Sequence, residues 1–195
     1  MLSEKEFFKK QKIYQTNRLK LRQFKVDDAD SMYTYTSNPN VAKYCSWPVY
    51  QTIEEAQKYI QFILTCYEKQ VLAPWAIEIV ETGEMIGAID FVSWSDMHEN
   101  VEVGYVIAEE HWGKGYVTEA FSKLIQIAFE EINVHRLTAK CCSVNQASAA
   151  VMKKNGLFFE GKTRESFYKD QQFYDMDHYG MVRNDYFARV YTQTN

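Results

Sequence analysis

The chain has 195 residues, of which 46% are hydrophobic and 25% charged, and its formal net charge is −4. This length and composition are typical of one globular domain that can bury a core without disulfide or metal cross-links. A mildly acidic protein is a poor electrostatic partner for nucleic acid or an anionic membrane, whereas it is compatible with a cationic ligand such as an amine.

The cysteine pattern argues against a metal site. None of the four cysteines forms a CxxC pair, and the adjacent Cys141 and Cys142 do not have zinc-ligand spacing. We therefore expect no metal and four reduced thiols in a cytoplasmic protein. The charged start at residues 1–6 lacks the apolar region of a signal peptide, and no apolar run reaches membrane-spanning length.

The first half of the chain predicts strands interspersed with two capped helices. In order, we expect an arm or short helix at 1–14, a strand at 18–24, a helix from Asp27 that ends at Asn38-Pro39-Asn40, a helix at 52–68, a strand pair at 75–80 and 85–92, and a polar loop at 93–100. The acidic Asp27-Asp28 pair suits a helix N-terminus. Thr52 and Glu55 have the spacing of a capping box.

The second half predicts the remaining elements. They are a strand at 101–108, a helix at 115–132, a strand at 135–144, a helix at 145–155, a strand pair at 157–168 and 173–182, and a tail at 184–195. Asn145 is a good N-cap, and Gly156 suits a left-handed C-cap. We expect a single α+β domain over residues 15–183, with a mixed sheet of about seven strands flanked by about four helices.

The most informative segment joins the strand at 101–108 to the following helix. Its sequence, Trp112-Gly-Lys-Gly-Tyr-Val-Thr118, places two glycines directly before the helix. Free backbone N–H groups and the helix dipole then favour an anion, and a pyrophosphate is the natural ligand. A dinucleotide fingerprint would need a third glycine at Thr118, and the chain has no Walker A motif.

Four motifs in order resemble those of the GNAT N-acetyltransferases. They are Thr16 to Arg22, then Glu102-Val-Gly-Tyr-Val-Ile107 with Trp112 to Ala120, then Asn145-Gln-Ala-Ser148 with Lys154-Asn-Gly-Leu157, and Asp177-His-Tyr-Gly-Met181. In particular, the chain resembles the RimJ/RimL branch, whose members acetylate ribosomal-protein N-termini and other amines. The resemblance covers roughly residues 15 to 183.

This resemblance implies a co-substrate site for acetyl-CoA between two splayed central strands, 101–108 and 135–144. The implied cofactor-binding residues are Tyr105, Val106, Ile107, Gly113, Lys114, Gly115, Tyr116, Val117, Thr118 and Asn145. Two positions depart from the family pattern. Trp112 stands where Arg or Gln is usual, and Val117 replaces the usual Gly or Ala. We expect the β-branched Val117 to narrow the approach of the pyrophosphate without abolishing binding.

The resemblance also implies direct attack of an amine on the thioester. Such a reaction needs a base for the ammonium and an acid for the leaving thiolate. Glu102 is the candidate base, with His98, His111 or water as alternatives, and it is equally compatible with being an exposed, solubilising residue. Ser148 is the candidate acid, although it also fits as an ordinary residue of the helix that Asn145 caps.

The acceptor pocket is expected where the two N-terminal helices face the last strand pair. Its candidate aromatic residues are Trp47, Tyr50, Trp94, Tyr168 and Tyr174. The acceptor is a protein N-terminus by preference, with a polyamine, an aminoglycoside or a small amine as alternatives, and a homodimer is compatible with this interpretation. Two other classes stay open, namely a CoA-binding sensor without turnover and an anion-binding interaction domain.

Overall fold

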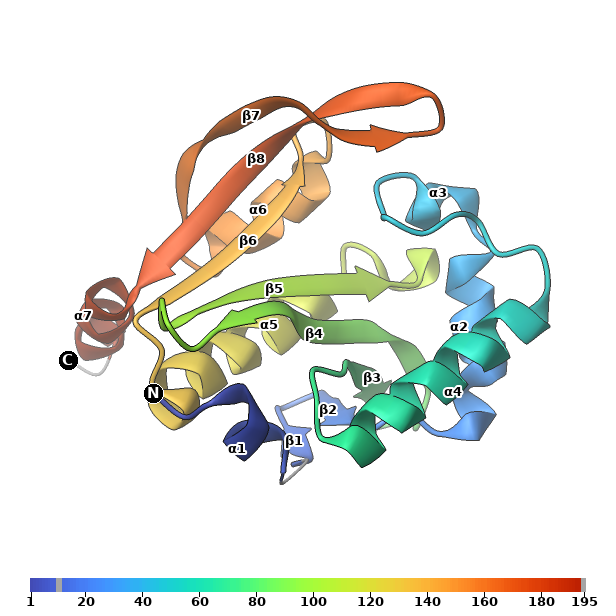
Figure 1. Cartoon of the computed structure of the whole chain (residues 1–195), viewed down its shortest axis with the longest axis horizontal. Helices are drawn as coiled ribbons and strands as arrows, with labels where there is room; N and C mark the ends of the chain where they lie inside the picture. The colour runs from blue at the N-terminus through green and yellow to red at the C-terminus, as the bar shows by residue number, and fades with distance from the viewer. Residues whose placement is uncertain (10–11, 194–195) are drawn as a thin grey trace.

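The computed structural model describes residues 1–9 and 12–193. Residues 10–11 and 194–195 belong to the predicted arm and tail and lie outside the described residues. The described chain forms one mixed sheet with helices on both faces (Figure 1). The eight strands follow the order β1-β2-β3-β4-β5-β6-β8-β7. Their bounds are β1 Tyr14–Gln15, β2 Leu19–Arg22, β3 Trp75–Ile79, β4 Met85–Ser95, β5 Asn100–Ile107, β6 Arg136–Cys142, β7 Phe158–Lys169 and β8 Gln172–Val182.

The helices bury one face each against the sheet. Their bounds are α1 Glu4–Phe8, α2 Ala29–Thr36, α3 Pro39–Ala42, α4 Ile53–Lys69, α5 Tyr116–Gln126, α6 Gln146–Lys154 and α7 Arg183–Gln193. A π-helical stretch, Ile127–Ile132, continues α5. The side chains of α5 and α6 join the larger core cluster, whereas those of α2 and α4 form a second cluster on the opposite face. No described helix has the length and apolar character needed to span a bilayer.

The predicted α+β fold is confirmed, and all seven predicted strands are present with shifted ends. The eighth strand, β1, has two residues, which is too short to show an alternating pattern. The segment expected to end the first helix also begins another. Pro39 occupies the first turn of α3, and the Asn38 side chain accepts a hydrogen bond from the Asn40 N–H at 2.9 Å.

Two segments predicted to be irregular are ordered. Residues 183–193 form α7, where Tyr186 stacks on Phe129 with ring centroids 5.0 Å apart. Its hydroxyl also donates to Glu130 at 2.6 Å. The predicted polar loop at 93–100 is shorter than expected, because β4 runs to Ser95 and β5 begins at Asn100. A bulge between Phe91 and Ser93 shifts the register between these two strands.

The two central strands diverge, as the family resemblance implies. Strands β5 and β6 run parallel but pair only at Asn100–Arg136, Val101–Leu137 and Glu102–Thr138. Beyond these pairs β5 continues to Ile107 and β6 to Cys142 without pairing to each other. The sheet therefore opens between its two halves, and the facing backbone edges are free to bind an extended ligand.

A buried ion pair fixes the base of α2 to the sheet. The guanidinium of Arg22 donates two hydrogen bonds of 2.7 Å to the two carboxylate oxygens of Asp28, and it also contacts Glu78 of β3. Both Arg22 and Asp28 are buried. Because a bidentate pair sets orientation as well as distance, it positions α2 beside the opened sheet.

Candidate active site

A cleft of about 1430 Å³ occupies the space between the splayed strands. It is lined by both halves of the sheet, by the loop from Gly113 to Thr118 (the glycine loop) and by α2, α4 and α6. Most predicted site residues line it: Trp47, Tyr50, Glu102, Tyr105, Val106, Ile107, Gly113, Gly115, Tyr116, Val117, Thr118, Asn145 and Ser148. The cleft thus brings together residues that are a hundred positions apart in the sequence.

The glycine loop presents six consecutive backbone N–H groups without partners. Among the described residues, no amide from Gly113 to Thr118 donates a hydrogen bond, and the first helical bond of α5 runs from the Glu119 N–H to the Gly115 carbonyl. Gly113 and Gly115 have positive φ angles of 73° and 80°. This backbone curvature makes an anion nest at the N-terminus of an eleven-residue helix.

Arg18 holds this loop from behind. Its Nη1 donates to the Lys114 carbonyl at 3.0 Å, its Nε pairs with Glu119 at 2.6 Å, and its guanidinium lies over the Tyr116 ring. Thr16 adds a 2.6 Å hydrogen bond to the same glutamate. The loop is therefore fixed before any ligand arrives, whereas the exposed Lys114 side chain lies outside the cleft lining.

Val117 lines the cleft and also packs in the core. Its side chain is 8% exposed and belongs to the larger core cluster with α5 residues. The amide of Val117 is one of the six without a partner. The expectation that this β-branched side chain narrows the approach of the pyrophosphate stays a prediction.

A pair of hydroxyl groups closes the cleft on the α6 side. The Tyr105 hydroxyl lies 2.9 Å from Ser148 Oγ and also donates to the Ser148 carbonyl at 3.1 Å. Asn145 caps α6, because its Oδ1 accepts the Ser148 N–H at 3.1 Å. Burial raises the pKa of Tyr105, so its phenol stays protonated at neutral pH. The sequence predicted Tyr105 as a cofactor-binding residue and gave no indication of this side-chain contact.

The candidate base Glu102 is ion-paired. Its Oε1 lies 3.0 Å from Nζ of Lys140, on the neighbouring strand β6, and its side chain is 23% exposed. Of the two alternative histidines, His111 lines the cleft and His98 does not. His98 is exposed in the turn before β5 and does not line the cleft. His111 is buried beside the glycine loop, where its Nε2 lies 3.1 Å from Glu84.

Two of the predicted acceptor residues form an aromatic wall of the cleft. The rings of Trp47 and Tyr50 lie 5.9 Å apart and both line the cleft. Lys169, at the tip of the β7–β8 hairpin, fixes this wall with three hydrogen bonds. Its Nζ donates to the carbonyls of Ala42 at 2.7 Å, Cys45 at 2.7 Å and Trp47 at 2.6 Å. The hairpin and the 42–47 segment therefore meet across the cleft (Figure 1).

Three other predicted acceptor residues lie outside the cleft lining. Trp94 packs against Phe7 of α1 and against Phe91, since the bulge after Phe91 turns both rings to the same face. Tyr174 contacts the back of Tyr44, with ring centroids 6.2 Å apart. Tyr168 stacks on Phe173 and is mostly exposed at the hairpin tip.

One carboxylate in the cleft went unpredicted. Asp90 of β4 lies deep in the cleft, and burial raises its pKa to about 7. It makes no hydrogen bond or ion pair with the described residues. Only the strand pattern Ile89-Asp90-Phe91 could have drawn attention to it, and that pattern also fits a solvent-exposed strand position.

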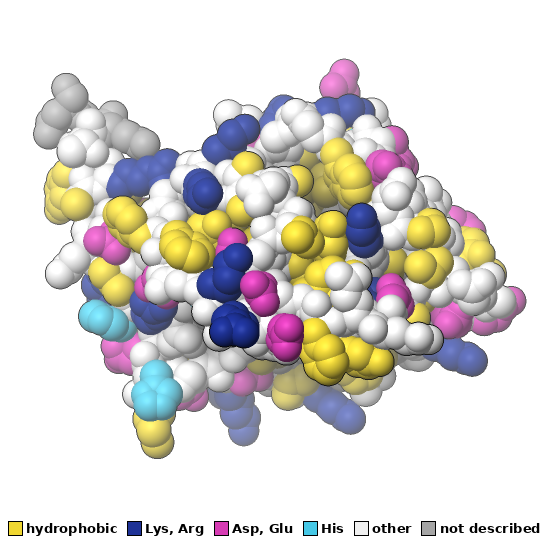
Figure 2. All heavy atoms as spheres, turned by 90° about the horizontal axis from the view of Figure 1, so that it is seen from above, with side chains coloured by type: hydrophobic (Ala, Val, Ile, Leu, Met, Phe, Trp, Pro, Cys, Tyr) yellow, Lys and Arg dark blue, Asp and Glu magenta, His cyan; other side chains and the backbone are white. Residues whose placement is uncertain are grey.

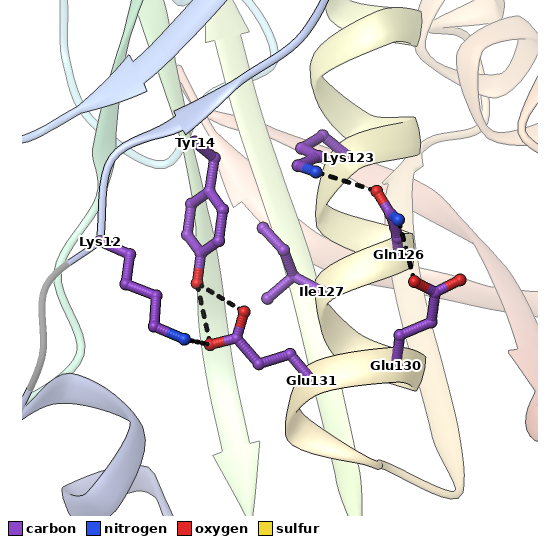
Figure 3. Close-up of a pocket in the computed structure, with 7 residues that line it drawn as sticks. All are labelled: Lys12, Tyr14, Lys123, Gln126, Ile127, Glu130 and Glu131. Atoms are coloured by element: carbon purple, nitrogen blue, oxygen red, sulfur yellow. Dashed lines mark hydrogen bonds and ion pairs between the residues drawn. The ribbon is translucent and has the colours of Figure 1, made fainter.

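Two other clusters of polar side chains are weaker candidates for a functional site than the cleft. Within the described residues, Glu84, Glu110 and His111 could hold a metal ion, but both carboxylates are exposed. A second hollow of about 310 Å³ lies beside α5 (Figure 3). There Glu131 binds Tyr14 and Lys12, and Gln126 bridges Lys123 and Glu130, so the polar groups satisfy one another. This hollow serves to dock the N-terminal segment.

On the face seen from above, charged side chains form no large acidic or basic patch. Figure 2 shows hydrophobic side chains mixed with basic and acidic ones there, with neither sign forming a continuous field. Exposed aromatic residues include Phe158, Phe159, Tyr168 and Phe173 of the β7–β8 hairpin. Recognition is therefore better sought inside the cleft than on this surface.

Comparison with known proteins agrees with this geometry. The model of the acetyltransferase (GNAT) domain matches residues 18–157. YoaA of Bacillus subtilis, described as an uncharacterized N-acetyltransferase, is 33% identical over 171 residues, which are 88% of this chain and 97% of YoaA. The ribosomal-protein-serine acetyltransferase of Escherichia coli is 25% identical over 138 residues, 70% of this chain and 76% of that protein.

Solved structures show the same fold. A GNAT-family acetyltransferase from Bacillus anthracis superposes with a TM-score of 0.80 at 25% identity, covering 89% of this chain and 99% of that one. RimL, titled a ribosomal L7/L12 α-N-protein acetyltransferase in complex with coenzyme A, has a TM-score of 0.78 at 21% identity, with the same coverage of both chains. The chain belongs to the GNAT family of N-acetyltransferases, in its RimJ/RimL-like branch.

Proposed function

We propose that the protein transfers an acetyl group from acetyl-CoA to a primary amine, with a protein N-terminus as the favoured acceptor. The observation that carries this proposal is the row of six unpartnered amides at the end of the splayed strand β5. These N–H groups fit a pyrophosphate, and the open edge of β5 fits an extended pantetheine arm. RimL with coenzyme A and MccE with acetyl-CoA and AMP, both at a TM-score of 0.78, support the same ligand.

The acceptor class rests on relatives and on the cleft. The Escherichia coli relative is named for ribosomal-protein serine, and a Vibrio cholerae relative, 21% identical over 176 residues, is named spermidine N(1)-acetyltransferase. Both names describe transfer to an amine. A wide cleft with the Trp47–Tyr50 wall has room for a peptide end as well as for a small amine.

In the proposed reaction the amine nitrogen attacks the thioester carbonyl carbon directly. A carbon–nitrogen bond forms, the carbon–sulfur bond breaks, and the ammonium proton must leave before or during attack. The departing thiolate takes a proton from the Tyr105–Ser148 hydroxyl pair, which is well placed for it. The second proton that the nitrogen releases on becoming an amide restores this pair by way of solvent. The Asn145 side-chain NH₂ donates to no described residue and is available to the pantetheine arm.

The direct test is an acetyl-transfer assay. The protein is incubated with acetyl-CoA and a panel that contains peptides with free N-termini, spermidine, an aminoglycoside and simple alkylamines. Thiol release and the mass of the acetylated product are followed together. Release with a matching product supports the proposal. Tight CoA binding without release would instead indicate a CoA sensor, and absence of CoA binding would overturn both functions in favour of another anion ligand.

A further inference from the structure

Asp90 is a carboxylate in the cleft that the reaction above does not yet use. It lies at the middle of β4 and pairs across the sheet with Gly104 of β5. Its oxygens make no hydrogen bond or ion pair with the described residues, while the cleft leaves them accessible. A buried carboxylate without a partner is costly, so such a group in a ligand cleft points to a cationic ligand.

We propose that Asp90 is the counter-ion of the acceptor's ammonium group and accepts its proton before the amine attacks the thioester. This assignment rests on the proposed function and specifies the acceptor as an amine that enters the cleft charged. The proton passes from the ammonium nitrogen to a carboxylate oxygen of Asp90, which leaves the nitrogen lone pair free. The proton on Asp90 then leaves to solvent after transfer.

The face of the sheet supports this assignment. Side chains alternate along a strand, and the neighbours Ile89 and Phe91 face the larger core that contains α5. Asp90 therefore faces the opposite side, where Ala88 and Val106 pack with α2 and α4. That is also the side of the aromatic wall. The amine and Asp90 consequently share one face of the opened sheet.

Gly104 provides the space beside the carboxylate. A Cβ atom at this position would lie 3.2 Å from Oδ1 of Asp90 and 2.5 Å from Cγ1 of Val92. The carboxylate therefore lies directly against β5, one residue before Tyr105. The Tyr105 ring packs on Phe121 of α5, on the other face. The proposed proton acceptor and the hydroxyl pair that meets the thiolate thus flank the same short stretch of β5.

The charges around Asp90 suit the role. Burial raises its pKa to about 7, which balances its ionised and neutral forms at neutral pH. Tyr59 and Tyr67 of α4 interact electrostatically with it, and both are neutral phenols whose pKa values burial raises. In the same cleft the Tyr35 and Tyr50 phenols are neutral as well, and Glu102 is engaged by Lys140. An incoming ammonium is then the natural partner.

The test compares wild type with Asp90→Asn, Glu102→Gln and the control Asp27→Asn, which removes an exposed carboxylate that does not line the cleft. The value of kcat/KM for the best amine of the panel is measured from pH 5.5 to 9. Wild type and Asp27→Asn should rise with pH and level off near 7. In Asp90→Asn, kcat/KM for the amine should fall about a hundredfold and should no longer level off near pH 7. The KM for acetyl-CoA should be unchanged.

The outcomes separate the two carboxylates. Retention of the inflection by Asp90→Asn, or its loss in Glu102→Gln alone, would overturn the proposal in favour of Glu102 or water as the base. Asp90→Glu should recover part of the lost rate if a carboxylate is what matters. The fall in kcat/KM caused by Asp90→Asn should also be largest below the amine's own pKa, because a free-base amine needs no proton acceptor.

A binding measurement keeps Asp90 testable even if no amine in the panel reacts, in which case the proposed function itself fails. At pH 8, n-butylammonium chloride should raise the melting temperature of wild type above that in equal sodium chloride, and Asp90→Asn should lack this difference. Equal shifts would overturn the counter-ion role. Because folding favours the neutral carboxyl, wild type should also lose stability relative to Asp90→Asn as the pH rises from about 4 to 7.

Discussion

Gly115 combines a left-handed backbone conformation with a free amide in the glycine loop. Its φ of +80° lies in the left-handed region, and its amide belongs to the unpartnered row that opens on the cleft. Gly115→Val should cost about 1–2 kcal/mol of stability through backbone strain. It should also raise the KM for acetyl-CoA by about tenfold, since a shifted loop misaligns several N–H donors at once. Thermal unfolding and steady-state kinetics measure the two effects.

Gly83 supplies a matched control. It has a φ of +72° in the turn between β3 and β4, with nothing within 4 Å of an added Cβ. Gly83→Val should therefore carry a similar strain and leave the KM for acetyl-CoA unchanged. An equal rise in the KM for acetyl-CoA in both variants would mean that the rise comes from general instability. Gly115 would then have no specific role in binding acetyl-CoA.

Single residues differ in how well sequence alone could place them. The glycine loop, Asn145 and Ser148 follow local motifs, and the structure brings them to one cleft. Asp90 has no local signal, because its face of β4 is covered by α2 and α4, which precede it by more than twenty residues. Trp94 lies outside the cleft because a bulge reversed its face, and a bulge leaves no mark in an alternating pattern.

The β7–β8 hairpin acts on the site through one lysine. The ammonium of Lys169 is the common donor to three carbonyls of the 42–47 segment, which carries Trp47. Lys169→Met should release this segment and weaken stability by about 2 kcal/mol, since hydrogen bonds from a charged donor are lost. The KM for the amine should rise severalfold, whereas the KM for acetyl-CoA should stay the same, because the glycine loop lies elsewhere.

Arg164 offers the comparison on the same hairpin. It is exposed and makes none of the described hydrogen bonds or ion pairs. Arg164→Met removes one positive charge from β7 without touching the 42–47 segment, so both KM values should match wild type. If Lys169→Met behaves like Arg164→Met toward the amine, the hairpin does not shape the acceptor wall.

Among the elements, long periodic segments were predictable and short or packing-dependent ones were not. The helices α4 and α5 carry wide apolar stripes and cap signals, and both appear where expected. In contrast α3 has four residues, and α7 is polar apart from a few residues such as Tyr186 that dock on the core. Their stability comes from tertiary contacts, which a local pattern does not contain.

The whole molecule consists of two sheet halves joined by a short parallel ladder. Five strands lie on one side of the opening and three on the other, and only three residue pairs connect β5 to β6. The helix α5 packs under the first half and contacts α6 of the second. A ligand that inserts between the halves therefore supplies hydrogen-bond partners to backbone groups that have none within the sheet.

This architecture predicts that coenzyme A stabilises the fold strongly. Binding only to the native state adds about 2.7 kcal/mol at a ligand concentration one hundred times Kd. For a domain of this size we expect the melting temperature to rise by about 5–10 °C. Thermal scans over a series of CoA concentrations measure the shift, and dephospho-CoA and pantetheine separate the parts of the ligand. Pantetheine lacks the pyrophosphate and should give a much smaller shift.

The same scans test whether the amides of the glycine loop account for the stabilisation by CoA. If the six amides bind the pyrophosphate, Gly115→Val should lose most of the shift with CoA and keep the small shift with pantetheine, whereas Gly83→Val should keep both. Equal shifts for CoA and pantetheine in wild type would place the binding energy on the β5 edge alone. The glycine loop would then be a structural turn, and the pyrophosphate site would have to be sought elsewhere along the cleft.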